Sequence, residues 1–252
     1  MKKTIPLLMI FISLGVLAQE NLVVKITYSE KLNFDLPVVK TSELFFKSTQ
    51  SYYLEKKSEQ IVDDKKFKVK GKKNNTSNKI ININLEKDSI FTKTSLDKTF
   101  FLVQEKLNKI VWKIHEKTYN IILGFKSTKA TGYFRGRIYT VWFTKEIPTT
   151  FGPWKLNGLP GLILEAKDNL NEIFFIAEKI EYLKKEEAPF NFLKKNSYEK
   201  ISLKEFNKKL NEKLESKMQQ IISKLPKGSK VTSYKFKKYK GIELKYEWEK
   251  DK

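Results

Sequence analysis

The chain contains only two arginines, and they lie two residues apart in the run Arg135-Gly136-Arg137. Every other cation among its 50 lysines and arginines is a lysine. A guanidinium presents a planar fork of five N–H donors that matches a carboxylate or phosphate, which a lysine ammonium cannot reproduce. Because nearly all cations of this chain are lysines, two arginines so close together indicate that these two positions need the geometry of the guanidinium group. We predict a binding site or a buried ion-pair site around Arg135 and Arg137, with Trp142 and Trp154 close to it.

Other side chains that could carry out chemistry are few. The chain has no cysteine and a single histidine, His115, so thiol chemistry is excluded and a serine–histidine–aspartate arrangement would depend on one imidazole. His115 follows an ordinary strand pattern, far in sequence from any serine in a sharp turn, and we interpret it as a structural residue. A glycine-rich phosphate loop is absent from the sequence, and we predict no metal site and no cofactor.

Glu165 and Asp168 are the carboxylates that could perform acid–base catalysis. They lie three residues apart on a predicted strand, where successive side chains alternate between the two faces, so they are expected to point in opposite directions. Pairing with lysines or with the two arginines is the favoured interpretation. A carboxylate-dependent hydrolase remains the weaker alternative.

The arginines are expected on a strand at residues 135–143, whose side chains alternate in character. One face of this strand would carry Arg135, Arg137, Tyr139, Val141 and Phe143. Two guanidiniums on such a face require carboxylates, carbonyl oxygens or water as partners. Further on, Pro160 and Gly161 fit the second and third positions of a type II turn, where Gly161 would supply the positive φ. A strongly apolar strand begins directly after that turn.

This second stretch contains the six-residue motif Gly-Leu-Pro-Gly-Leu-Ile, made of Gly158, Leu159, Pro160, Gly161, Leu162 and Ile163. Aromatic, glycine and arginine residues at 134–137, 142–144 and 151–156 accompany it. On these residues the chain resembles the GLPGLI family, strongly over residues 120–170 and elsewhere by pattern. The resemblance implies a secreted or periplasmic protein, and it implies no particular activity.

The remaining sequence is typical of an antiparallel β protein, because turn residues recur between short alternating segments. Further strands are predicted at residues 22–28, 42–47, 51–56, 65–70, 80–85, 89–93, 100–104, 110–114, 120–125, 171–183 and 234–248. Ser202 and Glu205 form a capping box that opens an amphipathic helix, which ends by Leu225 because Pro226 follows. We expect a mainly β, β-rich α+β fold: a curved antiparallel sheet or partial barrel of about ten strands. The C-terminal helix would pack on its concave face.

The first residues predict export. A basic start and a short apolar run precede Ala18, which indicates a signal peptide at residues 1–18, followed by one domain at residues 19–252. No cysteine follows the cleavage site, so a lipoprotein is excluded, and no later segment is apolar enough to span a membrane. The expected location is the periplasm, the outer membrane or the medium. An uncleaved N-terminal anchor is the alternative.

The formal net charge of +21 comes from lysines spread along the whole chain, which favours a solvated lysine-rich surface over a dedicated anion site. Nucleic acid is not an expected partner of an exported protein. We expect a non-catalytic periplasmic or cell-envelope binding protein, with an apolar groove for a lipid, a peptide or a partner protein. An envelope protein, a lipid or an anionic glycan are the partners considered. The alternative is an envelope assembly or structural subunit that adds a strand to a partner.

Overall fold

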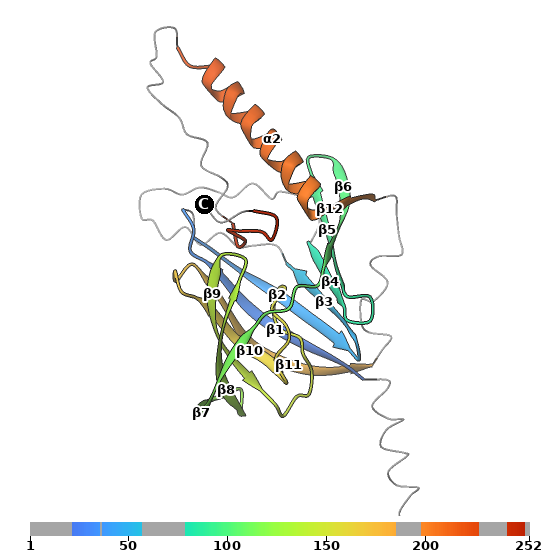
Figure 1. Cartoon of the computed structure of the whole chain (residues 1–252), viewed down its shortest axis with the longest axis vertical. Helices are drawn as coiled ribbons and strands as arrows, with labels where there is room; N and C mark the ends of the chain where they lie inside the picture. The colour runs from blue at the N-terminus through green and yellow to red at the C-terminus, as the bar shows by residue number, and fades with distance from the viewer. Residues whose placement is uncertain (1–21, 36, 57–78, 185–197, 227–240, 250–252) are drawn as a thin grey trace, which may run out of the picture.

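The computed structural model describes residues 22–35, 37–56, 79–184, 198–226 and 241–249, and it confirms a mainly β fold. Within these residues, twelve strands form one open, mostly antiparallel sheet, followed by the helix α2 (Figure 1). The strands are β1 (Leu22–Leu32), β2 (Val38–Lys47), β3 (Gln50–Glu55), β4 (Ile80–Asn84), β5 (Ser89–Leu96), β6 (Thr99–Lys106), β7 (Trp112–Ile122), β8 (Phe125–Phe134), β9 (Arg137–Thr144), β10 (Leu162–Asp168), β11 (Ile173–Lys184) and β12 (Glu199–Ser202). The helix spans Leu203–Ser223.

The sheet consists of two antiparallel meanders that meet at its centre. Its strand order is β12-β6-β5-β4-β3-β2-β1-β11-β10-β9-β8-β7, so β1 pairs with β11 although they are far apart in sequence. Among the described strands, only the short β12 runs parallel to its neighbour, β6. Because neighbouring strands of each meander follow one another in the chain, short turns suffice for most connections.

Alternation along the strands divides the sheet into two faces. We call the face that carries the main core the inner face. On β9, for example, Arg137, Tyr139, Val141 and Phe143 are buried there, while Ile138 on the opposite side is exposed. This alternation is the one that the sequence predicted for residues 137–143, and it places charged and apolar side chains on the same face.

A long loop between β9 and β10, residues 145–161, fills the inner face. Five of its apolar side chains belong to the main core: Ile147, Phe151, Trp154, Leu156 and Leu159. The Phe151 ring packs on Phe46 of β2 at 5.9 Å, and the Trp154 ring packs on Phe134 of β8 at 5.6 Å. We call this loop the plug, because its contacts reach strands on both sides of the sheet centre.

The structure gives Gly161 of the six-residue motif a different role from the one that the sequence predicted. Gly161 has a φ of +159°, far from the value near +80° that the third position of a type II turn takes. A Cβ atom on Gly161 would lie 2.1 Å from the backbone oxygen of Thr144. Glycine is therefore required at this position because two backbone segments pass in contact, and the type II turn is wrong.

The arginine strand begins two residues later than predicted. Arg135 and Gly136 have φ values of +50° and +86° and form the two-residue turn between β8 and β9, in which Phe134 pairs with Arg137. Two successive positive φ values define the hairpin turn that follows the right-handed twist of its strands. Arg135 is therefore a turn residue, although its side chain is buried.

Several other predicted boundaries differ. Residues 110–114 and 120–125 were expected as two strands, but Trp112–Ile122 is one long edge strand that includes a register shift. The tail was expected to be a strand, but its described residues 241–249 have no regular secondary structure. The predicted strand at 65–70 and the predicted signal peptide at 1–18 lie outside the described residues.

The helix begins at the predicted capping box. The Ser202 side chain accepts a hydrogen bond from the Glu205 backbone N–H, and the Glu205 carboxylate accepts one from the Ser202 N–H. Its contacts with the sheet involve mainly β6 and β12 at the sheet edge, and from there the helix projects away from the sheet (Figure 1). The far half leaves Met218 and Ile221 exposed, so α2 does not cover the inner face along its length. Within the described residues, no helix combines the length and the apolar character needed to cross a membrane.

Candidate functional site

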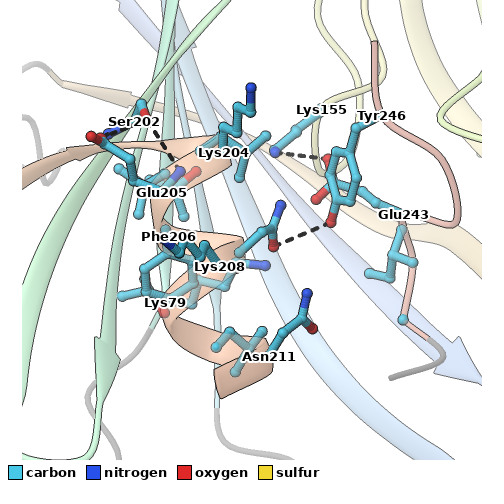
Figure 2. A pocket seen from close by; sticks show the side chains of 18 of the residues that line it. Lys79, Lys155, Ser202, Lys204, Glu205, Phe206, Lys208, Asn211, Glu243 and Tyr246 are labelled. Carbon is cyan, nitrogen blue, oxygen red and sulfur yellow. Dashed lines mark hydrogen bonds and ion pairs between the residues drawn. The ribbon is translucent and has the colours of Figure 1, made fainter. Parts of the chain in front are cut away.

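A cavity of about 1000 Å³ lies between the inner face, the first turns of α2 and the C-terminal residues 241–249. Figure 2 shows Phe206 and Asn211 of α2 on one side of this cavity, and Glu243 and Tyr246 on the other. Its floor is formed by side chains of β2, β3 and β5, by Lys79 directly before β4, and by Trp154 and Lys155 of the plug. The cavity is therefore the part of the inner face that the plug leaves open.

Charged side chains occupy the floor in place of the apolar residues that fill the rest of the inner face. Lys40 Nζ lies 2.7 Å from Glu55 Oε2 and 3.0 Å from Glu30 Oε1. Lys79 Nζ lies 3.1 Å from Glu55 Oε1. Glu30 is fully buried behind Lys40, where its second oxygen accepts hydrogen bonds from the hydroxyl groups of Ser42 and Tyr53. These residues form a continuous alternation of carboxylates and ammonium groups.

The two carboxyl groups of this cluster respond differently to their surroundings. Burial alone would raise the pKa of Glu55, but the attraction of Lys79 and Lys40 outweighs it and lowers the pKa to about 2. Burial, with repulsion from Glu55, raises the pKa of Glu30 above its ordinary value, although Lys40 partly offsets it. Burial would lower the pKa of Lys40, yet the two carboxylates raise it. Glu55 and Lys40 are consequently charged at neutral pH.

A second charged cluster joins the plug to the hairpin turn. Lys155 Nζ donates to Glu105 and, at 3.0 Å, to Glu243 Oε1. The Arg135 guanidinium is shared by three glutamates: Nη2 donates to Glu105 at 2.8 Å, Nη1 to Glu243 at 2.6 Å and Nε to Glu247 at 2.7 Å. Burial would raise the pKa of Glu243, but Lys155 and Arg135 lower it. The cluster thus contains two cations and three carboxylates.

Arg137 forms the third cluster and is fully buried. Its Nη1 donates to Asp168 Oδ2 at 2.5 Å and to Glu172 Oε2 at 2.9 Å. Its Nε and Nη2 donate to the backbone oxygens of Ile242 and Gly241, both at 2.8 Å. The two arginines therefore connect the sheet to the C-terminal residues.

Residues 241–249, which we call the strap, form the wall of the cavity opposite α2. The strap crosses the hairpin turn, where the backbone N–H groups of Leu244 and Lys245 donate to the Arg135 oxygen at 2.9 and 3.2 Å. A Cβ atom on Gly136 would lie 2.8 Å from Leu244 Cβ, so glycine also permits this close approach.

Aromatic rings and two unsatisfied polar groups face this space. Trp154 lies on the floor, and the rings of Tyr246 and Trp248 in the strap are stacked at 4.6 Å with an interplanar angle of 4°. Among the described residues, the Thr92 hydroxyl and the Asn207 side-chain amide nitrogen are buried and have no hydrogen-bond partner. Both residues line the cavity, so a ligand there could satisfy both groups.

The structure places the other predicted candidates away from one another. Trp142 is half-buried on β9 and packs against the core, outside the cavity lining. Asp168 is buried on the inner face and bound to Arg137, whereas the partly buried Glu165 lies on the opposite face of β10. Burial raises the pKa of Glu165. His115 lies 3.1 Å from the Thr131 hydroxyl on the edge hairpin. Glu165 and Asp168 thus do not converge, as their spacing predicted.

Sequence reasoning missed the floor residues Lys40, Glu55, Lys79, Thr92 and Lys155. The sequence of β2 contained a usable signal, because Lys40 lies two residues before Ser42 in the same alternation as the buried Ser42, Leu44 and Phe46. Alternation therefore places all four side chains on the inner face. Extending strand alternation to charged residues would have placed Lys40 on the core side. The predicted groove was apolar, whereas the floor of the observed cavity is largely charged.

The fold and the site together define a class of protein: a domain built on one open antiparallel sheet, with a plugged inner face and a polar cavity beside the plug. The chain belongs to the PNGase F-II N-terminal domain family, described as "N-glycanase peptide, N-terminal domain", whose family model matches residues 46–205. No curated protein matches the chain.

Two solved structures of PNGF-II agree with this fold. The structure in the P21 crystal form has a TM-score of 0.54 and 16% sequence identity, and the match covers 74% of this chain and 32% of PNGF-II. The C2 crystal form has a TM-score of 0.51 and 17% identity, covering 72% and 31%. An uncharacterized conserved protein from Thermus thermophilus matches with a TM-score of 0.40 and 7% identity, covering 75% of this chain and 98% of that protein. The chain spans about a third of the length of PNGF-II.

The resemblance to the GLPGLI family is therefore wrong. The PNGase F-II N-terminal domain model matches residues 46–205, which include the whole stretch on which that resemblance rested. The physical reason lies in what the motif does: Gly161 allows two backbones to touch, and Leu162 and Ile163 are buried core residues of a sheet. Glycine, proline and apolar residues meet such needs in unrelated sheets, so a short motif of this composition identifies a local structure rather than a family.

Proposed function

We propose that this chain is a non-catalytic binding domain that takes a neutral, polyhydroxylated ligand of the oligosaccharide type in the cavity. One observation carries the proposal: each of the three lysines on the cavity floor is paired with a carboxylate. The pairs are Lys40 with Glu30 and Glu55, Lys79 with Glu55, and Lys155 with Glu105 and Glu243. The floor therefore offers many polar atoms and little unpaired charge.

This pairing disfavours charged ligands. An anion would have to compete with carboxylates that the lysines already hold, and a cation would meet lysines beside every acid. A hydroxyl group both donates and accepts, so it can bridge a carboxylate and an ammonium without separating them. The unsatisfied Thr92 hydroxyl and Asn207 amide nitrogen offer further partners of the same kind.

The aromatic lining supports the same ligand class. Flat rings present apolar faces with a defined orientation, on which the C–H face of a sugar ring can pack. Trp248 in the strap supplies such a face, because it lines the cavity, is 37% exposed and has only one side of its ring stacked on Tyr246. A polar floor beside an aromatic wall suits an amphipathic, uncharged ligand. A lipid would instead require the apolar groove that the sequence predicted.

Binding is favoured over catalysis by the state of the acids at the cavity floor and on β10. With a pKa lowered to about 2, Glu55 holds no proton to donate at neutral pH. Glu30, whose pKa is raised, is fully buried behind Lys40 and is not part of the cavity lining. Glu165 and Asp168 lie on opposite faces of β10.

The family also supports a carbohydrate ligand, since its name refers to an N-glycanase. Because the chain spans about a third of PNGF-II, we extend only a binding role to it and no reaction. Export to the periplasm or the cell envelope remains the expectation from residues 1–18.

Isothermal titration calorimetry with three oligosaccharide series tests the proposal. The N-acetylglucosamine oligomers are neutral, the unacetylated glucosamine oligomers are cationic and the galacturonate oligomers are anionic. We expect binding of the neutral series, weakened about fivefold or more by Thr92→Val, which removes one hydroxyl group at nearly constant volume. Thr131→Val, at the edge hairpin, is the matched control and should bind as the wild type does. Binding of a charged series alone, or equal affinities for wild type and Thr92→Val, would contradict the proposal.

A second candidate function rests on β7, which is an edge of the sheet within the described residues. Tyr119 and Ile121 on this strand are 62% and 60% exposed. An exposed apolar edge strand is a template for pairing with another chain, as the assembly-subunit alternative requires. If β7 mediates association, Ile121→Lys will abolish any oligomer seen by size-exclusion chromatography with light scattering and leave oligosaccharide binding unchanged.

A further inference from the structure

The strap is attached to the domain in a different way from the plug. The plug contributes five apolar side chains to the main core, so its removal would expose a large apolar surface. The strap has no regular secondary structure and is held mainly by hydrogen bonds and ion pairs. Of its apolar residues, Ile242 packs against the main core and Tyr246 packs near β6 and β12.

The arginines that hold the strap do not depend on it for a charged partner. Without the strap, Arg135 keeps Glu105, and Arg137 keeps Asp168 and Glu172. Glu243 and Glu247 would then be hydrated rather than left buried and unpaired. Detachment therefore avoids the large free-energy cost of isolating a charge in the interior. This arrangement permits two states of the domain, with the strap docked or released.

The position of the strap links these states to the cavity. Gly241, Ile242, Glu243, Tyr246 and Trp248 are part of the cavity lining, and Glu243 also binds Lys155 on the floor (Figure 2). Release would remove this wall and leave the cavity open on that side. The backbone of the strap is held at the hairpin turn, where it contacts Arg135 and Gly136.

We propose that residues 241–249 form a detachable strap, and that its docking on Arg135 and Arg137 controls whether the cavity has a wall on the side opposite α2. The two arginines are positioning residues in this device: they hold the strap in place, while the floor and the strap contact the ligand. A ligand that touches both floor and strap binds the docked state better and therefore shifts the equilibrium toward it. The strap equilibrium exists without ligand, so its test does not depend on the identity of the ligand.

Hydrogen–deuterium exchange of the full chain, followed by mass spectrometry, tests the proposal without ligand. Peptides that cover the strap are compared with peptides that cover the plug in wild type, Arg135→Lys and Glu247→Gln. In Arg135→Lys the planar fork for Glu243 and Glu247 is lost, and we expect strap exchange to rise about tenfold or more. In Glu247→Gln, whose side chain is 48% exposed, we expect a rise of about threefold. Plug exchange should stay constant.

Glu247→Gln keeps the proposal open to refutation if Arg135→Lys fails to fold, because Glu247 lies at the surface end of the strap. Lys106→Ala, which breaks an exposed ion pair with Asp88 at the C-terminal end of β6, is the control and should change the exchange of neither peptide. A strap that exchanges as slowly as the plug in every variant would overturn the proposal. Strap and plug exchange that rise together in Glu247→Gln would also overturn it, since the strap would then open only with the whole domain. Failure of the oligosaccharide titration would leave this result unchanged.

Discussion

Arg137 and Asp168 form an ion pair at 2.5 Å in which both side chains are completely buried. Asp168 also accepts hydrogen bonds from the backbone N–H groups of Glu172 and Ile173 through its second oxygen, at 2.8 and 2.9 Å. Arg137 uses its remaining donors on the strap. The pair therefore joins four parts of the chain: β9, β10, the turn before β11 and the C-terminal strap.

The first prediction concerns this pair. Asp168→Asn keeps the shape of the side chain but leaves the Arg137 guanidinium without its closest buried counter-charge. Removing one partner of a buried pair destabilises a protein by about 3–5 kcal/mol. We expect a loss of this size in the free energy of unfolding, measured by urea titration. Lys106→Ala, which breaks an exposed pair, should change stability by less than about 1 kcal/mol. A stable Asp168→Asn protein would show that Glu172 alone can neutralise Arg137.

The second prediction compares two glycines in equivalent hairpin turns. Gly124 and Gly136 have φ values of +85° and +86°. A Cβ atom on Gly124 would meet no atom of the described residues within 4 Å, whereas one on Gly136 would meet the strap. Gly124→Ala should cost about 1 kcal/mol, the backbone penalty alone. Gly136→Ala should cost more and should also raise hydrogen exchange in residues 241–249. Equal effects of the two substitutions on stability and exchange would mean that the strap does not press on the turn.

The third prediction is the pH dependence that Glu55 gives to folding. Its pKa is lowered to about 2 in the folded state, so the unfolded state binds the proton more tightly. The stabilisation is complete above a pH of about 4.5 and is lost as the pH falls toward 2. A difference of this size corresponds to about 3 kcal/mol. Urea titrations from neutral to strongly acidic pH should show a shallower loss of stability in Glu55→Gln than in wild type. Parallel curves would mean that Lys40 and Lys79 do not stabilise the ionised form.

The fold was largely predictable because the sequence of most strands alternates between apolar and polar residues. Alternation marked β1, β2, β4, β5 and β9, and the capping box at Ser202 and Glu205 gave the start of α2 to within a residue. Residue spacing also indicated that Glu165 and Asp168 point apart. These features depend on local geometry, which a sequence contains.

The site was only partly predictable, because its partners are far apart in the chain. The sequence indicated that Arg135 and Arg137 need carboxylates, but four of those carboxylates, Glu105, Glu172, Glu243 and Glu247, come from segments that only the folded sheet brings together. Arg135 was also misplaced on the strand, since arginine is an unusual residue at a positive φ and three glutamates hold it there. Ion pairs between distant segments, and a positive φ that such pairs stabilise, leave no pattern in the local sequence.

The final prediction concerns the cap of α2, whose first turns form one wall of the cavity. In the capping box the Ser202 hydroxyl satisfies the Glu205 backbone N–H, which would otherwise lack a partner at the helix start. Ser202→Ala should destabilise the helix start by about 1 kcal/mol. Because α2 contacts the sheet mainly at its first turns, we expect faster hydrogen exchange at residues 203–210 while β1 and β2 remain protected. Ser223→Ala, at the exposed last residue of the helix, is the matched control and should leave that region unchanged. Unaltered exchange at residues 203–210 in Ser202→Ala would mean that packing of Leu203 and Phe206, rather than the cap, fixes this wall of the cavity.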